Sequence, residues 1–268
     1  MENQYKYALI TGATQGIGYE LAKLFAKDGY NLVITARSRE ELDTAAGELK
    51  QYGIQVIASA RDLIIKEEVL GLCRELEEKG IEINILVNNA GQGVYGLFKD
   101  TDLERELDIV QLNINAPIIL AKHFLSKMMA RNEGRILNLA SIAGKTPGPW
   151  QSVYHGTKAF ILSFSEALRS ELQDTNITVT ALLPGPTDTD FFNKAGMNKS
   201  KAVQDKDSLA DPAAVARDGY DALMNNKDKV VSGFSNKIKA AVSTVLPDSL
   251  NAEMTKEQQK PADPQERR

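Results

Sequence analysis

The chain has 268 residues, of which 43% are hydrophobic and 25% are charged, as is usual for a globular protein. Its formal net charge of −4 gives no bulk basic character and argues against nucleic acid as a partner. Cys73 is the single cysteine, so an internal disulfide is excluded. The N-terminus is polar, and no apolar run approaches the roughly 18 residues that a bilayer span needs. We therefore expect no secretory signal, no membrane span and a cytoplasmic location.

Short apolar runs recur along the chain and alternate with longer amphipathic stretches. Several of the runs are almost continuously apolar, which is typical of parallel strands that are covered on both faces. The predicted strands are residues 7–11, 31–35, 54–59, 83–87, 135–139, 177–183 and 229–231. The predicted helices are residues 17–27, 39–52, 66–78, 101–129, 152–172 and 211–224.

This alternation of strand and helix predicts an α/β fold with a doubly wound parallel sheet in a single domain. We expect residues 1–247 to form that catalytic domain, because no convincing linker interrupts them. Residues 197–209 are polar and rich in lysine, which predicts a surface loop. Residues 248–268 are mostly polar or charged, and we expect them to form a flexible tail.

Three glycines follow the first predicted strand. Gly12, Gly16 and Gly18 permit a tight turn and let the backbone approach a ligand closely, while the next helix directs its free N–H groups at an anion. Between a strand and a helix this spacing predicts a site for the pyrophosphate of a dinucleotide, with a purely structural turn as the alternative. The neighbouring residues that would share the site are Thr14, Gln15 and Ile17.

The end of the second predicted strand lacks the carboxylate that NAD-binding sites place there for the ribose hydroxyls. Arg37 can instead form charge-assisted contacts with a 2′-phosphate, and Ser38 can add a hydroxyl. We therefore expect NADP(H) as the cofactor. The alternative is that Arg37 is a solvated surface residue. Gln15 is not basic, so it adds no second positive charge that would favour NADP(H) over NAD(H).

Tyr154 and Lys158 are four residues apart on a predicted helix and therefore share one face. A tyrosine ordinarily titrates near ~10, and a nearby ammonium favours the phenolate and lowers that pKa. Tyr154 can then supply the proton that an alkoxide needs after hydride transfer to a carbonyl, or remove it in the reverse direction. Taken alone, this spacing is common, and a surface pair is the alternative.

The order Thr11-Gly12-x-x-x-Gly16-x-Gly18 resembles the Thr-Gly-x-x-x-Gly-x-Gly fingerprint of the short-chain dehydrogenase/reductase family. The resemblance extends over most of the chain and is to the bacterial NADP(H)-dependent oxidoreductase branch. It implies a Rossmann-type sheet of about seven strands in the order 3-2-1-4-5-6-7, with helices on both faces.

The resemblance also completes a catalytic set. Ser141 precedes Tyr154 by 13 residues and would orient the reacting carbonyl and stabilise the developing oxyanion. Asn113 corresponds to the fourth catalytic residue of the family, whose role is to hold a water that links Lys158 to solvent. Asn115 is close by and is the alternative for that position.

Further cofactor contacts follow from the same resemblance. A pair of residues that follows the third strand matches the family's adenine-contacting pair. A set of three residues that follows the fourth strand matches a segment of small residues, and a set of four that follows the sixth strand matches the segment that binds the nicotinamide. The Tyr and Lys of the catalytic set would also touch the cofactor, and the family transfers the pro-S hydride. The residues concerned are Asp62, Leu63, Asn89, Ala90, Gly91, Tyr154, Lys158, Pro184, Gly185, Thr187 and Thr189.

These residues together predict hydride transfer between NADPH and a carbonyl or secondary alcohol. The expected substrate is a neutral hydrophobic ketone, aldehyde or 3-oxoacyl compound, because the family's pocket segments here are apolar and show no obvious Arg or Lys. The alternative function is an NADP(H)-binding regulator or scaffold with little turnover. The expected substrate wall consists of Val94, Tyr95, Ile142, Pro147, Trp150, Phe191 and Phe192.

Two further expectations concern metals and assembly. His123 and His155 have no second His or Cys at metal-ligand spacing, so we expect no metal, and we expect His155 to face away from the reacting groups. The resemblance implies a homodimer or homotetramer, with helix 101–129 and the helix of Tyr154 at the interface.

Overall fold

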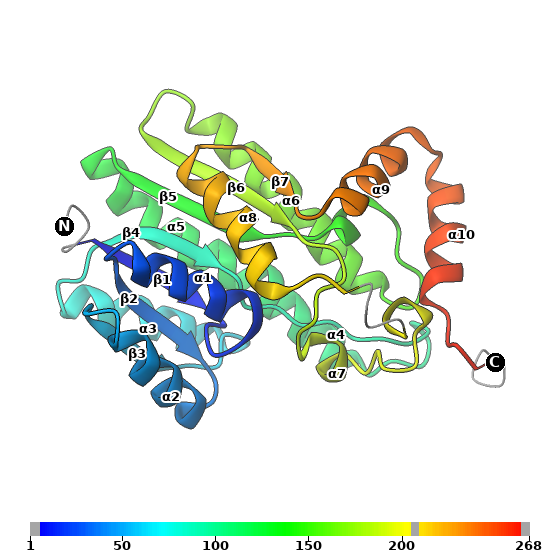
Figure 1. Ribbon diagram of the computed structural model, residues 1–268, viewed down its shortest axis with the longest axis horizontal. Helices are drawn as coiled ribbons and strands as arrows, with labels where there is room; N and C mark the ends of the chain where they lie inside the picture. Colours follow the sequence, from blue (N-terminus) through cyan, green and yellow to red (C-terminus); the bar gives the residue numbers. More distant parts are fainter. Residues whose placement is uncertain (1–5, 205–208, 264–268) are drawn as a thin grey trace.

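A computed structural model describes residues 6–204 and 209–263, and it contains a seven-stranded parallel sheet (Figure 1). The strand order is β3-β2-β1-β4-β5-β6-β7, which confirms the predicted doubly wound arrangement. The strands are β1 Tyr7–Thr11, β2 Asn31–Ala36, β3 Val56–Ala60, β4 Ile83–Asn88, β5 Gly134–Leu139, β6 Ile177–Leu183 and β7 Lys229–Val231.

Helices cover both faces of the sheet. In Figure 1, α1 and α8 lie in front of the strands and α5 and α6 lie behind them. The front layer and its buried cluster include α1 (Gly16–Lys27), α2 (Arg39–Lys50) and α8 (Pro212–Met224). The rear layer and its cluster include α3 (Lys66–Glu78), α5 (Ala116–Arg131) and α6 (Ser152–Glu171). Because both faces are covered, the strands are apolar along almost their whole length, as the sequence predicted.

The chain reverses its direction of travel across the sheet after β3, when it crosses back to add β4 on the other side of β1. β1 pairs with β2 on one side, where Leu9 is opposite Val33, and with β4 on the other, where Leu9 is opposite Leu86. Strands added after β1 therefore extend first one way and then the other. Such a switch opens a crevice at the carboxyl ends of the strands, which is where open α/β sheets bind ligands.

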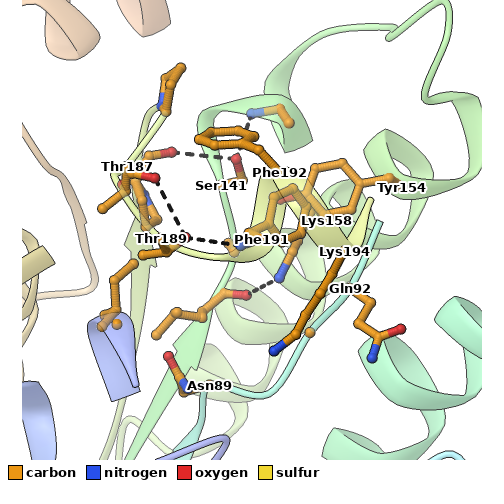
Figure 2. Close-up of a pocket in the computed structure, with 18 of the residues that line it drawn as sticks. Asn89, Gln92, Ser141, Tyr154, Lys158, Thr187, Thr189, Phe191, Phe192 and Lys194 are labelled. Carbon is orange, nitrogen blue, oxygen red and sulfur yellow. Dashed lines mark hydrogen bonds between the residues drawn. The ribbon is translucent and has the colours of Figure 1, made fainter. Parts of the chain in front are cut away.

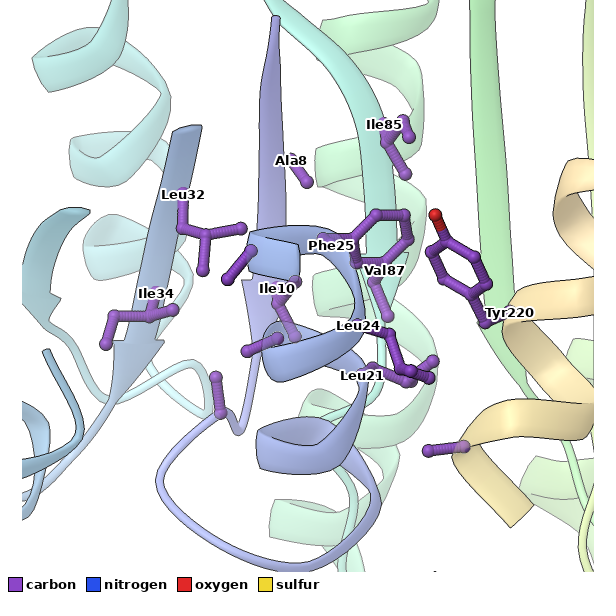
Figure 3. Close-up of a cluster of buried hydrophobic side chains, with 14 of the residues drawn as sticks. Ala8, Ile10, Leu21, Leu24, Phe25, Leu32, Ile34, Ile85, Val87 and Tyr220 are labelled. Carbon is purple, nitrogen blue, oxygen red and sulfur yellow. The ribbon is translucent and has the colours of Figure 1, made fainter. Parts of the chain in front are cut away.

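The front layer is anchored by aromatic packing (Figure 3). Phe25 of α1 is fully buried, and its ring lies 5.7 Å from that of Tyr30 and 4.9 Å from that of Tyr220 in α8, both edge-to-face. This contact joins α1 to α8 over the centre of the sheet. It fixes the position of α1, whose N-terminus begins at the glycine loop.

The long helix predicted over residues 101–129 is interrupted in the structure. It consists of α4 (Leu103–Val110), a π-helical turn over Gln111–Asn115 and α5. A π-helical turn accommodates an extra residue within continuous helix, and such turns occur frequently at functional sites. This one contains Asn113, whose side chain is buried.

The predicted flexible tail is wrong for residues 248–259, which form a helix. α9 (Phe234–Val245) is followed by α10 (Asp248–Gln259), and the two lie beyond the end of the sheet (Figure 1). Buried Asn251 joins them, because its Nδ2 donates to the carbonyl oxygens of Ser243 at 2.8 Å and Leu246 at 3.2 Å. These contacts between helices hold in place a segment whose own composition is polar.

The other end of α10 is held by the segment predicted as a surface loop. The N–H of Ala262 donates to the carbonyl of Lys199 at 2.9 Å, and Ser200 forms an antiparallel bridge with Pro261. A short 3₁₀ turn, Lys201–Val203, follows. Residues 205–208 of the predicted loop and 264–268 of the predicted tail lie outside the described residues.

Phe25→Ala should destabilise the protein by about 3–5 kcal/mol, because it leaves a large cavity under α1 and removes two aromatic contacts. Urea unfolding followed by circular dichroism measures this change. Phe98→Ala is the control, since Phe98 is 63% exposed and the substitution should change stability by no more than about 0.5 kcal/mol. Equal stability of the two variants would contradict this account of the core.

Candidate active site

A cavity of about 670 Å³ occupies the carboxyl edge of the sheet. It runs from the glycine loop and Arg37 past Ser141 and Tyr154 to α10. Figure 2 shows Ser141, Tyr154 and Lys158 gathered with Thr187, Thr189 and Phe191 at its centre. The structure thus brings together residues that the sequence placed after different strands.

The glycine loop has the backbone geometry that the sequence predicted. Gly12 and Gly16 have φ values of +66° and +57°, a conformation that other residues rarely adopt. Gly18 allows a close approach instead, since a Cβ there would lie 2.3 Å from Nδ2 of Asn89 and from the carbonyl oxygen of Gly12. The backbone is therefore left open at the N-terminus of α1, where a pyrophosphate would fit.

Asn89 fastens this loop to the end of β4. Its Nδ2 donates to the carbonyl oxygens of Thr11 at 2.8 Å and Gly12 at 3.0 Å. In return, the hydroxyl of Thr11 accepts from the N–H groups of Asn89 at 3.0 Å and Ala90 at 2.9 Å. This reciprocal set links the loop to the small-residue segment that contains Ala90 and Gly91.

The residues predicted to select the cofactor lie together at the Arg37 end of the cavity. Arg37 is exposed at the end of β2 and lines the cavity. Ser38 caps α2, because its Oγ accepts from the N–H of Glu41 at 3.2 Å. The hydroxyl of Thr14 donates to the Glu41 carboxylate at 3.1 Å. A carboxylate missed by the sequence analysis thus lies at this end, one helical turn beyond the predicted cation.

Asp62 and Leu63 also line the cavity on this side. The Asp62 carboxylate accepts from the N–H of Ile64 at 3.1 Å, which stabilises the turn after β3, and Leu63 is buried. Their position agrees with the predicted adenine-contacting pair, and the contact itself stays a prediction.

Lys158 is buried under the centre of the cavity. Its Nζ donates to the carbonyl oxygen of Leu139 at 2.8 Å and lies 5.8 Å from the centre of the Tyr154 ring. Ser141 ends the turn after β5, where its Oγ accepts from the N–H of Ala143 at 3.1 Å and donates to the carbonyl of Pro184 at 3.3 Å. Three side chains from β5 and α6 therefore converge at one point.

The pKa shifts of this group differ from the sequence-based expectation. Desolvation raises the pKa of Tyr154 to about 12, while a hydrogen bond with Ser141 acts in the opposite direction. Burial lowers the pKa of Lys158 to about 8. The prediction that Lys158 lowers the pKa of Tyr154 is therefore wrong for the protein alone. Desolvation outweighs the charge, because the ammonium is directed at Leu139 rather than at the phenol oxygen.

Asn113 lies behind Gly91, next to Lys158. A Cβ on Gly91 would be 3.2 Å from Oδ1 of Asn113 and 3.4 Å from Nζ of Lys158. The Asn113 amide donates to the carbonyl of Gln92 at 2.9 Å and to the hydroxyl of Thr157 at 3.0 Å. Its Oδ1 accepts from the N–H of Gln92 at 3.0 Å. Both N–H groups of the side chain are thus occupied by protein acceptors, and its predicted part in a water relay stays a prediction.

Asn115, the alternative for this position, points elsewhere. Its Nδ2 donates to Oε1 of Gln111 at 2.6 Å, within the π-helical turn itself. The geometry favours Asn113 over Asn115 as the residue that belongs to the site.

The segment after β6 closes the cavity from the opposite side. Pro184, Gly185, Thr187 and Thr189 all line it, and the hydroxyl of Thr187 donates to the carbonyl of Gly185 at 2.9 Å. A Cβ on Gly16 would lie 2.9 Å from Cγ2 of Thr189. The glycine loop and this segment therefore approach each other closely at Gly16. The residues of the loop and the segment fit a dinucleotide lying across the sheet edge.

The expected substrate wall is correct in part. Ile142, Phe191 and Phe192 line the cavity. The other four expected residues do not line it. Two of them pack on each other instead, since the Tyr95 ring stacks on that of Trp150 with centres 5.6 Å apart. The residues outside the lining are Val94, Tyr95, Pro147 and Trp150.

Several lining residues escaped the sequence analysis. Lys194 lines the cavity although no cation was expected in the wall, and its Nζ pairs with the Asp190 carboxylate at 3.1 Å. His155, expected to face away, is buried in the wall, as is Gln259 from α10. The contribution of α10 depends on contacts between residues about a hundred positions apart, for which the sequence holds no local signal.

Comparison with known proteins agrees with this geometry. The sequence model described as short chain dehydrogenase matches residues 6–200. The uncharacterised oxidoreductase YvrD of Bacillus subtilis is 38% identical over 185 residues, which cover 69% of this chain and 70% of YvrD. The ketoacyl reductase HetN of a Nostoc species is 28% identical over 254 residues, covering 92% of this chain and 87% of HetN.

Among solved structures, a short-chain dehydrogenase from Sphingobium yanoikuyae in complex with NADPH superimposes with a TM-score of 0.80. It is 29% identical, and the match covers 89% of this chain and 93% of that chain. The chain therefore belongs to the short-chain dehydrogenase family and is an oxidoreductase. Within the described ranges, no helix combines the length and apolar character needed to cross a membrane.

The buried lysine gives a stability prediction whose sign follows from its pKa. An exposed lysine has a pKa of 10.5, and burial lowers that of Lys158 to about 8. Below about pH 8 the folded protein must bury a charged ammonium, and this cost disappears as the pH rises to about 10.5. Lys158→Met should therefore increase the free energy of unfolding at pH 7 by about 1–3 kcal/mol, after the lost hydrogen bond to Leu139 is allowed for.

Urea unfolding of the cofactor-free protein at pH 7 and pH 10 measures this effect. The advantage of the methionine variant should be present at pH 7 and largely absent at pH 10. A variant that is less stable than the parent at both pH values would contradict the account of Lys158.

Proposed function

We propose that this protein is an NADPH-dependent reductase that converts a neutral, hydrophobic carbonyl compound to an alcohol. The single observation that carries the proposal is the convergence of Ser141, Tyr154 and Lys158 in a cavity continuous with the glycine loop. The cavity has room for a dinucleotide at one end and for a second molecule beyond Tyr154. Homo-oligomeric assembly and a cytoplasmic location belong to the same proposal.

NADPH would supply the hydride from the side of Thr187 and Thr189, and the chain's own residues would handle the oxygen and its proton. The hydroxyls of Ser141 and Tyr154 would both donate to the carbonyl oxygen as negative charge develops there. Tyr154 would then release its proton to that oxygen as a general acid. Because its pKa is about 12, the phenol is fully protonated at neutral pH and ready to act in reduction.

Lys158 would act through its charge. When Tyr154 gives up its proton, a phenolate forms within reach of the ammonium, which lies 5.8 Å from the ring centre. A nearby positive charge favours the phenolate in a desolvated site more than in water. A pKa of about 8 also lets Lys158 exchange protons near neutral pH.

The preference for NADPH rests on Arg37. The side chain is exposed at the end of β2, and no acid follows that strand directly. Arg37 would pair with the 2′-phosphate, with the Ser38 hydroxyl as a second donor. Glu41 lies on the next helical turn. Its carboxylate accepts a hydrogen bond from the Thr14 hydroxyl of the glycine loop and is therefore directed towards that loop.

The substrate class is supported by the wall of the cavity and by one relative. Phe191 and Phe192 form an apolar side, and the ring of Phe191 lies 5.2 Å from that of Tyr154. The similarity to a ketoacyl reductase favours a 3-oxoacyl compound within this class. Lys194 pairs with the Asp190 carboxylate at 3.1 Å, so its charge is compensated within the wall.

Assembly as a homodimer or homotetramer is supported by apolar side chains on two adjacent helices. Leu103 and Leu107 of α4 are 63% and 47% exposed, and Phe160 of α6 is 38% exposed. Exposed large apolar residues that gather on one face mark protein interfaces. A second copy of the chain is the occupant that the family resemblance implies.

Tyr154→Phe should reduce turnover of a ketone with NADPH by about 10²–10⁴-fold, because the proton donor is removed while the ring is kept. NADPH binding, measured by quenching of Trp150 fluorescence or by calorimetry, should be unchanged. Turnover is followed by the absorbance of the reduced nicotinamide. If the variant keeps full activity, the assignment of Tyr154 is wrong; if the parent protein binds NADPH but reduces no carbonyl, a regulatory or scaffold role is favoured.

Arg37→Ala should weaken NADPH binding by about tenfold to a hundredfold, since a charge-assisted contact is lost, and leave NADH binding within about twofold. Arg39→Ala is the matched control, because Arg39 is two residues away, 66% exposed and paired with Asp43 at 3.0 Å. Dissociation constants for both cofactors test the pair. Equal losses for NADPH and NADH, or equal effects in the two variants, would contradict the assignment.

A further inference from the structure

Three polar side chains from distant parts of the sequence meet in the cavity wall beside Tyr154. Gln151 precedes α6, His155 follows Tyr154 within it, and Gln259 ends α10. All three line the cavity, and all three are buried. The proposed reduction assigns none of them a role.

His155 and Gln259 form a pair with a defined direction. Nδ1 of His155 lies 2.8 Å from the carbonyl oxygen of Thr146, and its Nε2 lies 2.9 Å from Nε2 of Gln259. Because a carbonyl only accepts, Nδ1 carries the proton, and the lone pair on Nε2 accepts from the Gln259 amide. The ring is thus neutral and fixes which way the Gln259 amide points.

This orientation leaves two hydrogen-bonding atoms unused. Oε1 of Gln259 and Nε2 of Gln151 are buried and have no hydrogen-bond partner. The two residues are 8% and 4% exposed, so water does not compensate for the missing bonds freely. A buried amide without a partner costs free energy, and such groups are rare in folded proteins. One unused acceptor and one unused donor therefore belong to two side chains that line the same cavity, and both atoms are enclosed by protein.

Gln151 lies next to the reacting tyrosine, and Gln259 lies next to His155, which follows that tyrosine in α6. A Cβ on Gly93 would lie 3.4 Å from Nε2 of Gln151 and 3.4 Å from Cδ2 of Tyr154. The rings of Tyr154 and His155 have centres 6.1 Å apart. A substrate whose carbonyl lies at the Tyr154 hydroxyl would occupy the same cavity that these two residues line.

The position of Gln259 does not depend on its own side chain. Its backbone carbonyl accepts from the hydroxyls of Tyr95 and of Ser200, the latter at 2.9 Å. The side chain is therefore held at the cavity by the backbone of α10. Beyond it the wall is mixed, with the apolar side chains of Leu246 and Met254 beside the polar Asn251 and Thr255.

We propose that Gln151 and Gln259 form a specificity subsite for a neutral substituent that both accepts and donates a hydrogen bond, such as a carboxamide, next to the reacting carbonyl. This inference rests on the proposed reductase function. Gln151 donates to the oxygen of the substituent, and Oε1 of Gln259 accepts from its N–H or O–H group. The apolar remainder of the substrate lies against α9 and α10.

Three probes of equal chain length separate these contributions. N-ethyl-3-oxooctanamide has both an acceptor and a donor beside the ketone, ethyl 3-oxooctanoate has only an acceptor, and undecan-6-one has neither. The steady-state kinetics of each are measured with saturating NADPH for the parent protein, Gln151→Met and Gln259→Met. Methionine matches glutamine in length and removes only the hydrogen-bonding atoms.

We expect Gln259→Met to raise KM for the amide by about tenfold while KM for the ester and the ketone changes less than about twofold. Gln151→Met should raise KM for the amide and the ester by a similar factor and leave the ketone unchanged. Comparing each variant with the parent on the same probe cancels differences in intrinsic reactivity. Gln173→Met is the control, since Gln173 is exposed and lies outside the cavity.

One comparison uses the parent protein alone, so its result does not depend on whether a variant folds. N-ethyl-N-methyl-3-oxooctanamide lacks the N–H group and should have a KM about tenfold above that of the N-ethyl amide with the parent protein. Equal changes for all probes, or none, would overturn the subsite while turnover of undecan-6-one still supported the reductase. Absence of NADPH-dependent turnover on every probe would instead overturn the reductase proposal, and the subsite with it.

Discussion

The site depends on the hydrogen bonds that fasten the glycine loop to the end of β4. Asn89 binds two carbonyl groups of the loop, and the Thr11 hydroxyl binds two N–H groups of the β4 segment. This exchange satisfies backbone groups that would otherwise be stranded where two strands end. It also requires that Gly18 have no side chain, because a Cβ there would overlap Asn89. These hydrogen bonds therefore join the glycine loop and the small-residue segment after β4 into one unit.

The chemistry of the site follows from burial around that unit. Gly91 lies against both Asn113 and Lys158, so the absence of a side chain at one position lets the amide and the ammonium come close together. Desolvation then raises the pKa of Tyr154 and lowers that of Lys158. Both shifts penalise the charged forms, which keeps the phenol protonated, as the proposed reduction requires. The stability that is lost by burying Lys158 is a cost of placing a charge where the reaction needs it.

The sequence predicted those features that depend on neighbouring residues. Strand patterns and the glycine turn are local, and the structure contains both of them. The sequence did not predict the features that depend on contacts between distant residues. The π-helical turn at Asn113 has no distinct spacing pattern, and α10 is a polar segment that becomes ordered only through contacts such as those of Asn251 and Gln259. His155 was misplaced for the same reason, since its partner Gln259 lies 104 residues away.

The account's central claim is that hydride transfer occurs beside Tyr154, from the nicotinamide face set by the segment around Thr187 and Thr189. The most direct measurement is reduction of undecan-6-one with NADPH that carries deuterium at the pro-S position of its nicotinamide C4, followed by mass spectrometry of the alcohol. The account predicts an alcohol with one deuterium on the carbinol carbon. An unlabelled alcohol, with the deuterium left on the oxidised cofactor, would contradict it.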